Sequence, residues 1–107
     1  MNNETWYTLQ NHVYHYYKKY VKGNENTSHE LAERKLNRNI RLAKPILRGK
    51  IQSIYSYGCL MIKTKSDEKG DRIIAVYNNK YPDKNWELHN KKFKKLNKKF
   101  DIPMEVS

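Results

Sequence analysis

The sequence is poor in residues that restrain a chain or divide it into parts. It has one cysteine, Cys59, so no disulfide can form within the chain, and its place in an apolar run predicts a small buried thiol. With four glycines and three prolines the sequence forms no linker that would separate two domains. No apolar run approaches the roughly 18–20 residues of a transmembrane helix. We expect one cytoplasmic domain over residues 1–107, with a loose tail at 101–107 and no membrane contact.

Negative charge is also scarce. Asp and Glu number 11 against 22 Lys and Arg, which gives a formal net charge of +11. Such an excess draws a protein to polyanions. Only five of the basic residues are arginines, and lysine is a compact charge that suits phosphate attraction better than base reading. The codons of the abundant Asn, Lys and Tyr are A/T-rich, so an A/T-biased genome, such as that of many low-GC bacteria and their phages or plasmids, is an alternative source of part of the positive charge. Such drift would not arrange the charges in stripes. We expect a protein of phage, plasmid or other mobile-element type.

Two helices are predicted in the first half of the chain. Apolar residues at three- and four-residue steps, among them Trp6, Leu9 and Val13, predict a helix over residues 3–22. The run Thr27–Glu30 has the form of a capping box and predicts a second helix that continues to Lys44. Pro45 cannot extend that helix, so it marks its end.

The second half has the pattern of a sheet followed by a helix. Segments 46–55, 59–65 and 72–77 are rich in Ile, Tyr, Val and Leu and predict a three-stranded antiparallel meander. Trp86, His89, Phe93, Leu96 and Phe100 then recur at helical steps and predict a last helix that begins after Asn85. We therefore expect an α+β fold with two N-terminal helices, a meander and one C-terminal helix.

This order of elements is loosely similar to that of winged helix-turn-helix proteins. It departs from them in three respects: the turn between the first two helices is long, no third helix precedes the hairpin, and the wing tip at Asp67, Glu68 and Asp71 is acidic. The similarity is one of architecture and carries no residue over.

A polar stripe on the second predicted helix is the main candidate site. Arg34, Asn37, Arg38 and Arg41 recur at three- and four-residue steps, so they share one helix face. Arginine can bond guanine with two hydrogen bonds, and asparagine can do so with adenine. The alternative interpretation is a solvated helix face. The absence of interleaved acidic residues after Glu33 favours binding, because solvated faces usually mix both signs of charge.

Further binding residues are expected on the neighbouring segments. Cations provide phosphate attraction and tyrosines provide stacking surfaces for bases. The expected residues are Arg48, Lys50, Tyr55, Tyr57, Lys91, Lys94, Lys95 and Lys98.

No motif in the sequence names a reaction. The acidic cluster at Asp67, Glu68 and Asp71 has the composition of a polar hairpin turn, and His12 with His15 has no further ligand nearby, so no metal or cofactor is expected. Small basic toxins that cut RNA without metal are similar in size and charge. That alternative would use His89, Tyr77 and Arg72, although the first strand of those toxins has no counterpart here.

The sequence thus favours a non-enzymatic nucleic-acid-binding protein. DNA is preferred over RNA as its partner, in single- or double-stranded form. A second alternative is a small phage-type inhibitor that binds a host nucleic-acid enzyme, so a host protein and a second copy of the chain remain candidate partners.

Overall fold

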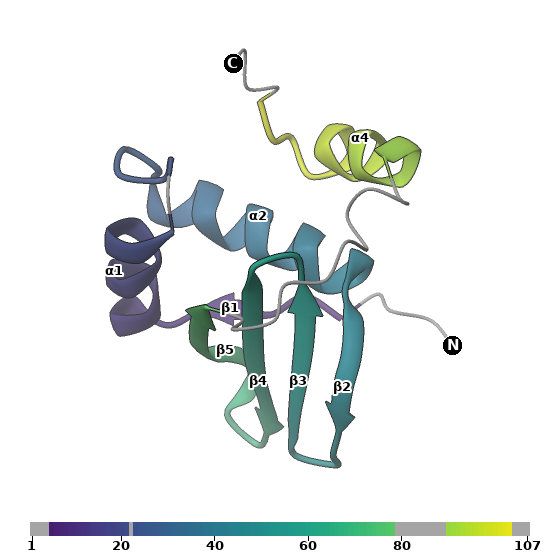
Figure 1. Cartoon of the computed structure of the whole chain (residues 1–107). Helices are drawn as coiled ribbons and strands as arrows, with labels where there is room; N and C mark the ends of the chain where they lie inside the picture. Colours follow the sequence, from purple (N-terminus) through teal and green to yellow (C-terminus); the bar gives the residue numbers. More distant parts are fainter. Residues whose placement is uncertain (1–4, 22, 79–89, 104–107) are drawn as a thin grey trace.

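The computed structural model describes residues 5–21, 23–78 and 90–103. Three helices and five strands lie in these ranges, and Figure 1 shows how they are arranged. In chain order they are β1 (Thr8–Leu9), α1 (Asn11–Tyr20), α2 (His29–Leu42), β2 (Lys44–Arg48), β3 (Gln52–Tyr57), β4 (Leu60–Asp67), β5 (Gly70–Asn78) and α4 (Asn90–Lys99). The predicted α+β class is confirmed. No helix in the described ranges is long and apolar enough to cross a bilayer.

The sheet has five strands in the order β1-β5-β4-β3-β2, so the predicted three strands were too few. Strands β2 to β5 form antiparallel neighbours, whereas β1 pairs with β5 in parallel. The predicted strand over residues 46–55 is in fact two strands joined by a tight turn. The Gly49 amide donates to the Gln52 carbonyl oxygen at 2.8 Å, and a Cβ at Gly49 would lie 2.6 Å from that oxygen. A glycine is therefore required at this turn.

The first predicted helix is wrong over residues 5–10, which are not helical and include strand β1. The Tyr7 amide donates to Asn37 Oδ1 at 2.8 Å, and Asn37 Nδ2 donates to the Tyr7 carbonyl at 2.8 Å. The Glu33 carboxylate accepts from the Leu9 amide at 2.8 Å and from Trp6 Nε1 at 3.0 Å. Two side chains of α2 thus take up the backbone groups that a helix would need. Helix α1 begins only at Asn11.

The ends of α2 also differ from the prediction. Ser28, one residue after the predicted cap, accepts the Leu31 amide with its hydroxyl at 3.2 Å. The Thr27 hydroxyl instead donates to Asn24 Oδ1 at 3.1 Å. The helix ends at Leu42, and Pro45 lies within β2. Because β2 is an edge strand, it tolerates a residue without an amide proton.

The core lies between one face of the sheet and the helices α1 and α2. Strand pairing sets Tyr55, Ile62 and Val76 side by side in one row of this face. The full cluster is Tyr7, Leu9, Val13, Tyr17, Ala32, Leu36, Ile40, Tyr55, Leu60, Ile62, Ile73 and Val76. Burial, together with a hydrogen bond and charge repulsion from Tyr55, raises the pKa of the Tyr7 hydroxyl well above its usual value. Tyr7 therefore stays neutral in the core.

Helix α4 packs against α2, outside the sheet (Figure 1). Asp101 follows the helix with a positive φ of 56°, and the Ile102 amide donates back to the Asn97 carbonyl at 2.8 Å. This left-handed helix end turns the Ile102 side chain inward, where it is buried. Within the predicted tail, Ile102 is thus packed against the fold, whereas Asp101 and Pro103 are exposed. Residues 104–107 are outside the described ranges, as is the predicted helix start at 85–89. Cys59 is exposed at the β3–β4 turn, so its predicted burial is wrong.

We predict that Asn37→Ala lowers the free energy of unfolding by roughly 2–4 kcal/mol, because it leaves the buried amide and carbonyl of Tyr7 without partners. Urea unfolding measures the change. Asn26→Ala, at an exposed asparagine of the α1–α2 turn, is the control and should leave the value nearly unchanged. Equal effects of the two substitutions would contradict the assigned role of Asn37.

Candidate nucleic-acid interface

The arginines of α2 face α4, where they form the contact between the two helices. The Arg38 guanidinium carbon lies 4.2 Å from the centre of the Phe93 ring, and its Nη1 donates to Asn97 Oδ1 at 2.8 Å. Arg41 lies over the Phe100 ring at 4.7 Å. Both are cation–π contacts, which planar guanidinium groups make well. We call this contact the α2–α4 seam.

The first predicted site is therefore largely internal. Arg38 is only 9% exposed, and Asn37 is 1% exposed with its amide bonded to Tyr7. Arg34 Nη1 reaches the Asp101 carbonyl at 3.4 Å, so it too contacts the segment after α4. Asn37 has no access to a base edge, and Arg38 is engaged within the fold. The prediction is thus corrected for Asn37 and Arg38, which make structural contacts, whereas Arg34 and Arg41 are partly exposed beside α4.

The two tyrosines expected to stack on bases differ in exposure. Tyr55 is a core residue with 6% exposure, so it cannot stack on a base. Tyr57 is partly buried at the end of β3, beside the β3–β4 turn. The sequence did not separate core tyrosines from exposed ones, because strand alternation is ambiguous where a strand ends in a tight turn.

The lysines of α4, in contrast, are exposed. This ten-residue helix contains six lysines and no acidic residue: Lys91, Lys92, Lys94, Lys95, Lys98 and Lys99. No ion pair within the described ranges involves Lys91, Lys94, Lys95 or Lys98. Lys94 and Lys98, one helical turn apart, line a hollow of about 350 Å³ together with Asn97, Asp101 and Ile102. This helix therefore presents a dense and largely uncompensated positive surface.

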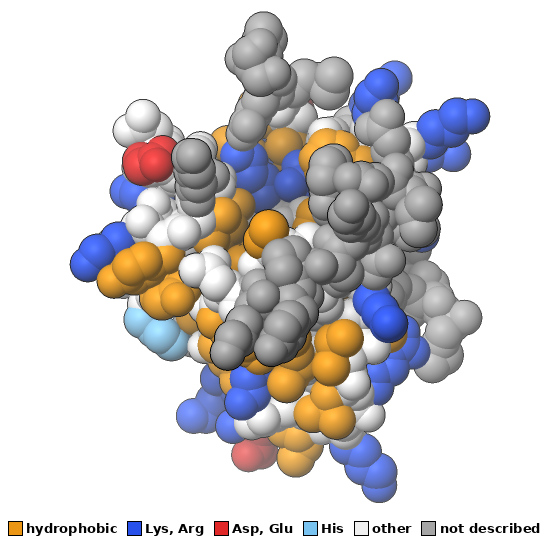
Figure 2. Space-filling view, in the orientation of Figure 1, with side chains coloured by type: hydrophobic (Ala, Val, Ile, Leu, Met, Phe, Trp, Pro, Cys, Tyr) orange, Lys and Arg blue, Asp and Glu red, His pale blue; other side chains and the backbone are white. Residues whose placement is uncertain are grey.

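A second exposed group lies on the β2–β3 hairpin. Its cations are Lys44, Arg48 and Lys50. Beside them Ile46, Leu47 and Ile51 are 54%, 52% and 55% exposed. Figure 2 shows hydrophobic side chains beside Lys and Arg over the lower end of the molecule, where β2 and β3 lie in Figure 1.

Arg48 and Lys50 were predicted as binding residues, but the three apolar residues were not, because the predicted strand over 46–55 contains no turn between them. A signal was present. Gly49 stands between two cations and interrupts the apolar pattern, as turn residues do.

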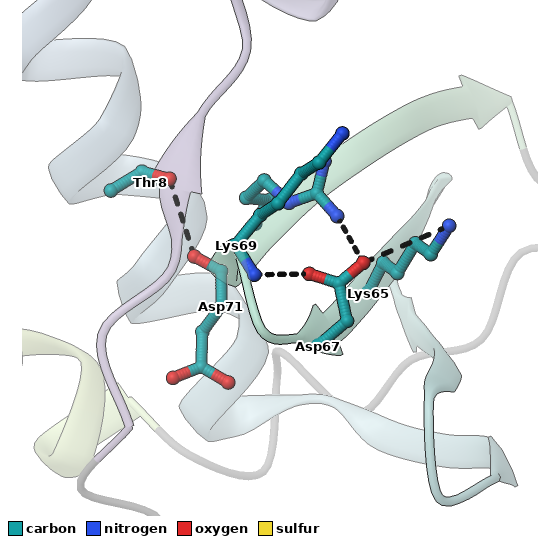
Figure 3. A network of polar contacts seen from close by, with 6 residues as sticks. Thr8, Lys65, Asp67, Lys69 and Asp71 are labelled. Atoms are coloured by element: carbon teal, nitrogen blue, oxygen red, sulfur yellow. Dashed lines mark hydrogen bonds and ion pairs between the residues drawn. The ribbon is translucent and has the colours of Figure 1, made fainter.

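The acidic cluster lies in the β4–β5 hairpin turn, where neighbouring cations offset the negative charge of Asp67 (Figure 3). Asp67 accepts from the Lys69 amide at 2.9 Å and from Arg72 Nη2 at 2.7 Å, with Lys65 Nζ at 3.9 Å. Desolvation acts to raise the pKa of the Asp67 carboxyl, but these donors together hold it below its usual value. The carboxylate and its cations thus largely cancel, and the turn adds little to the positive surface.

The residues of the ribonuclease alternative are not brought together by any described contact. Arg72 is paired with Asp67 at 2.7 Å, and Tyr77 is 37% exposed near the other end of β5. His89 lies outside the described residues. Within the described ranges no three His, Cys, Asp or Glu side chains gather in a way that would hold a metal ion.

The model of the YorE family matches residues 7–99 of the 107-residue chain. No curated protein and no solved structure matches the chain.

We predict that Arg38→Ala lowers the free energy of unfolding by about 2–3 kcal/mol, because it removes the contact with Phe93 and leaves Asn97 without its donor. Arg38→Lys should restore only part of the loss, since an ammonium cannot stack as a plane. Urea unfolding again gives the values, and Lys98→Ala on the exposed side of α4 is the control. Full stability in Arg38→Ala would show that the arginine does not hold the seam.

Proposed function

We propose that this chain, which belongs to the YorE family, is a non-enzymatic nucleic-acid-binding protein of a phage, plasmid or other mobile element. DNA is its preferred partner. The observation that carries the proposal is the surface of α4. Six of the ten residues of this helix are exposed lysines, and none is acidic.

The density of charge supports this function more than the net charge does. Ten helical residues span about 15 Å, so the six lysines lie close together. Like charges at this spacing repel, and the repulsion is relieved when they neutralise phosphates. Condensed counterions are released at the same time, which adds a favourable entropy that depends on salt. Binding of a polyanion to this helix is therefore favoured over leaving its lysines close together in solution.

The seam supports the proposal from the other side of α4. The Phe93 and Phe100 rings face the arginines of α2, so the helix is held by its aromatic side. Its lysines are thereby left on the exposed faces. The arginines predicted to read bases thus orient the lysines that meet phosphates. Contacts of lysine with phosphates carry no direct sequence information. We expect weak discrimination among sequences.

We predict that replacing Lys91, Lys94, Lys95 and Lys98 by glutamine flattens the dependence of DNA affinity on salt. For a duplex, the slope of log affinity against log salt should fall in magnitude by about 0.9 for each lysine that neutralises a phosphate. Fluorescence anisotropy with labelled duplex DNA, single-stranded DNA and RNA over a salt series measures the slopes.

The matched control removes four lysines elsewhere, so that the net charge is the same. Lys18 and Lys19 lie over tyrosine rings of α1, Lys65 lies beside Asp67, and Lys69 is in the acidic turn. Replacing these four by glutamine should change the slope much less. Equal slopes in the two variants would assign the binding to net charge alone, and absence of salt-dependent binding by the unaltered protein would refute the function.

A further inference from the structure

The β2–β3 hairpin combines exposed apolar and basic side chains at one edge of the sheet. All five residues of β2 are exposed, and two large apolar residues lie at the hairpin tip, Leu47 near the end of β2 and Ile51 in the turn at 49–51. Arg48 and Lys50 lie between them in the chain, on either side of Gly49. Each of these apolar side chains keeps about half of its area in water, which costs free energy. A partner that covers them would remove this cost.

The edge is unsuited to pairing with the same edge of a second copy. Pro45 lacks an amide proton, and the pairing of β2 with β3 is irregular between Pro45 and Leu47. In an antiparallel pairing of two β2 strands centred on Ile46, Lys44 of each copy would face Arg48 of the other. Like charges opposite one another destabilise such a pair. Proline, irregular pairing and edge cations are the devices that proteins use to prevent strand addition.

The charge of the hairpin identifies a polyanion as the complementary partner. Lys44, Arg48 and Lys50 are exposed, and within the described ranges none of them takes part in an ion pair. A nucleic acid satisfies both halves of the surface, since its phosphates attract the cations and its bases present flat apolar faces. Proteins that bind the minor groove of DNA often insert apolar side chains between base steps, with basic residues beside them.

We propose that the β2–β3 hairpin enters the minor groove of duplex DNA and inserts Leu47 and Ile51 against the bases, with Arg48 and Lys50 on the flanking phosphates. The proposal rests on the nucleic-acid-binding function given above. Figure 1 places the hairpin tip at the end of the sheet away from α4, so it forms a second contact separate from the lysine helix. Insertion between base steps unstacks them and bends the duplex.

The experiment measures DNA bending and unstacking directly. A duplex of about 30 base pairs is labelled at its ends with a fluorescence energy-transfer pair and carries 2-aminopurine beside a central TA step, since such steps are easily unstacked. The unaltered protein should raise both energy transfer and 2-aminopurine fluorescence. Leu47→Ser with Ile51→Ser should abolish both signals, weaken binding about tenfold, and leave the salt slope unchanged because no charge is removed.

The control replaces two exposed side chains on another element, Tyr16→Ser with Tyr20→Ser on α1. This variant should bend DNA as the unaltered protein does, and thermal unfolding should show that both double variants are folded. Suppose that the unaltered protein binds DNA in a salt-dependent way but neither bends nor unstacks it. That result would overturn the insertion of Leu47 and Ile51 and leave the proposed binding function in place.

Sedimentation tests the other occupant of the apolar surface. A dimer that dissociates when Leu47 and Ile51 are replaced, with the DNA signals unchanged, would assign the surface to a second copy and overturn the proposal. A monomer whose DNA signals vanish in the same variant supports it.

Discussion

The arrangement of the molecule depends on the hydrogen bonds by which α2 holds the segment before α1. Asn37 uses both ends of its amide on the backbone of Tyr7, and Glu33 holds the Leu9 amide and the Trp6 indole. These bonds keep the segment extended, which lets β1 join β5 in parallel and places Leu9 in the core. Helix α1 can then start at Asn11 and cover the sheet beside α2. An amide and a carboxylate on one helix thus connect both layers of the fold.

The sequence predicts the elements with strong local patterns and fails where a distant partner decides. The α+β class, α2 and the described part of the last helix follow from periodicity. The strand at Thr8–Leu9 does not, because the apolar spacing around it is helical and its extended form depends on distant partners, the side chains of Asn37 and Glu33 and the strand β5. The β2–β3 turn was missed although Gly49 marks it, because the β-branched residues on both sides outweighed one glycine.

The candidate site could be predicted only as a set of charges. Sequence spacing places Arg34, Arg38 and Arg41 on one helix face correctly, but it cannot say that this face meets Phe93 and Phe100. Arginine next to an aromatic ring is stable in a partly buried contact, whereas lysine is a compact and strongly hydrated charge. Lys35 of α2 is buried all the same, with its ammonium bonded to Asn24 Oδ1 at 3.3 Å. The arginines of α2 are engaged within the fold, and the lysines of α4 are exposed.

Because of the α2–α4 seam, two parts of the molecule differ in local stability: α4, and the core formed by α2 and the sheet. Contacts between α2 and the sheet are apolar and continuous. The α4 segment is held by two guanidinium–ring contacts, hydrogen bonds to Asn97 and Asp101, an edge-to-face contact of Phe100 with Trp6, and the buried side chains of Leu96 and Ile102. Regions with few buried apolar contacts open at lower free energy than the core. Amide protons of α4 should therefore exchange with solvent sooner than those of β4. A polyanion that binds the closed form of α4 more tightly than the open form would slow this exchange, so the rate of exchange of α4 connects binding at its surface with the stability of the α2–α4 seam.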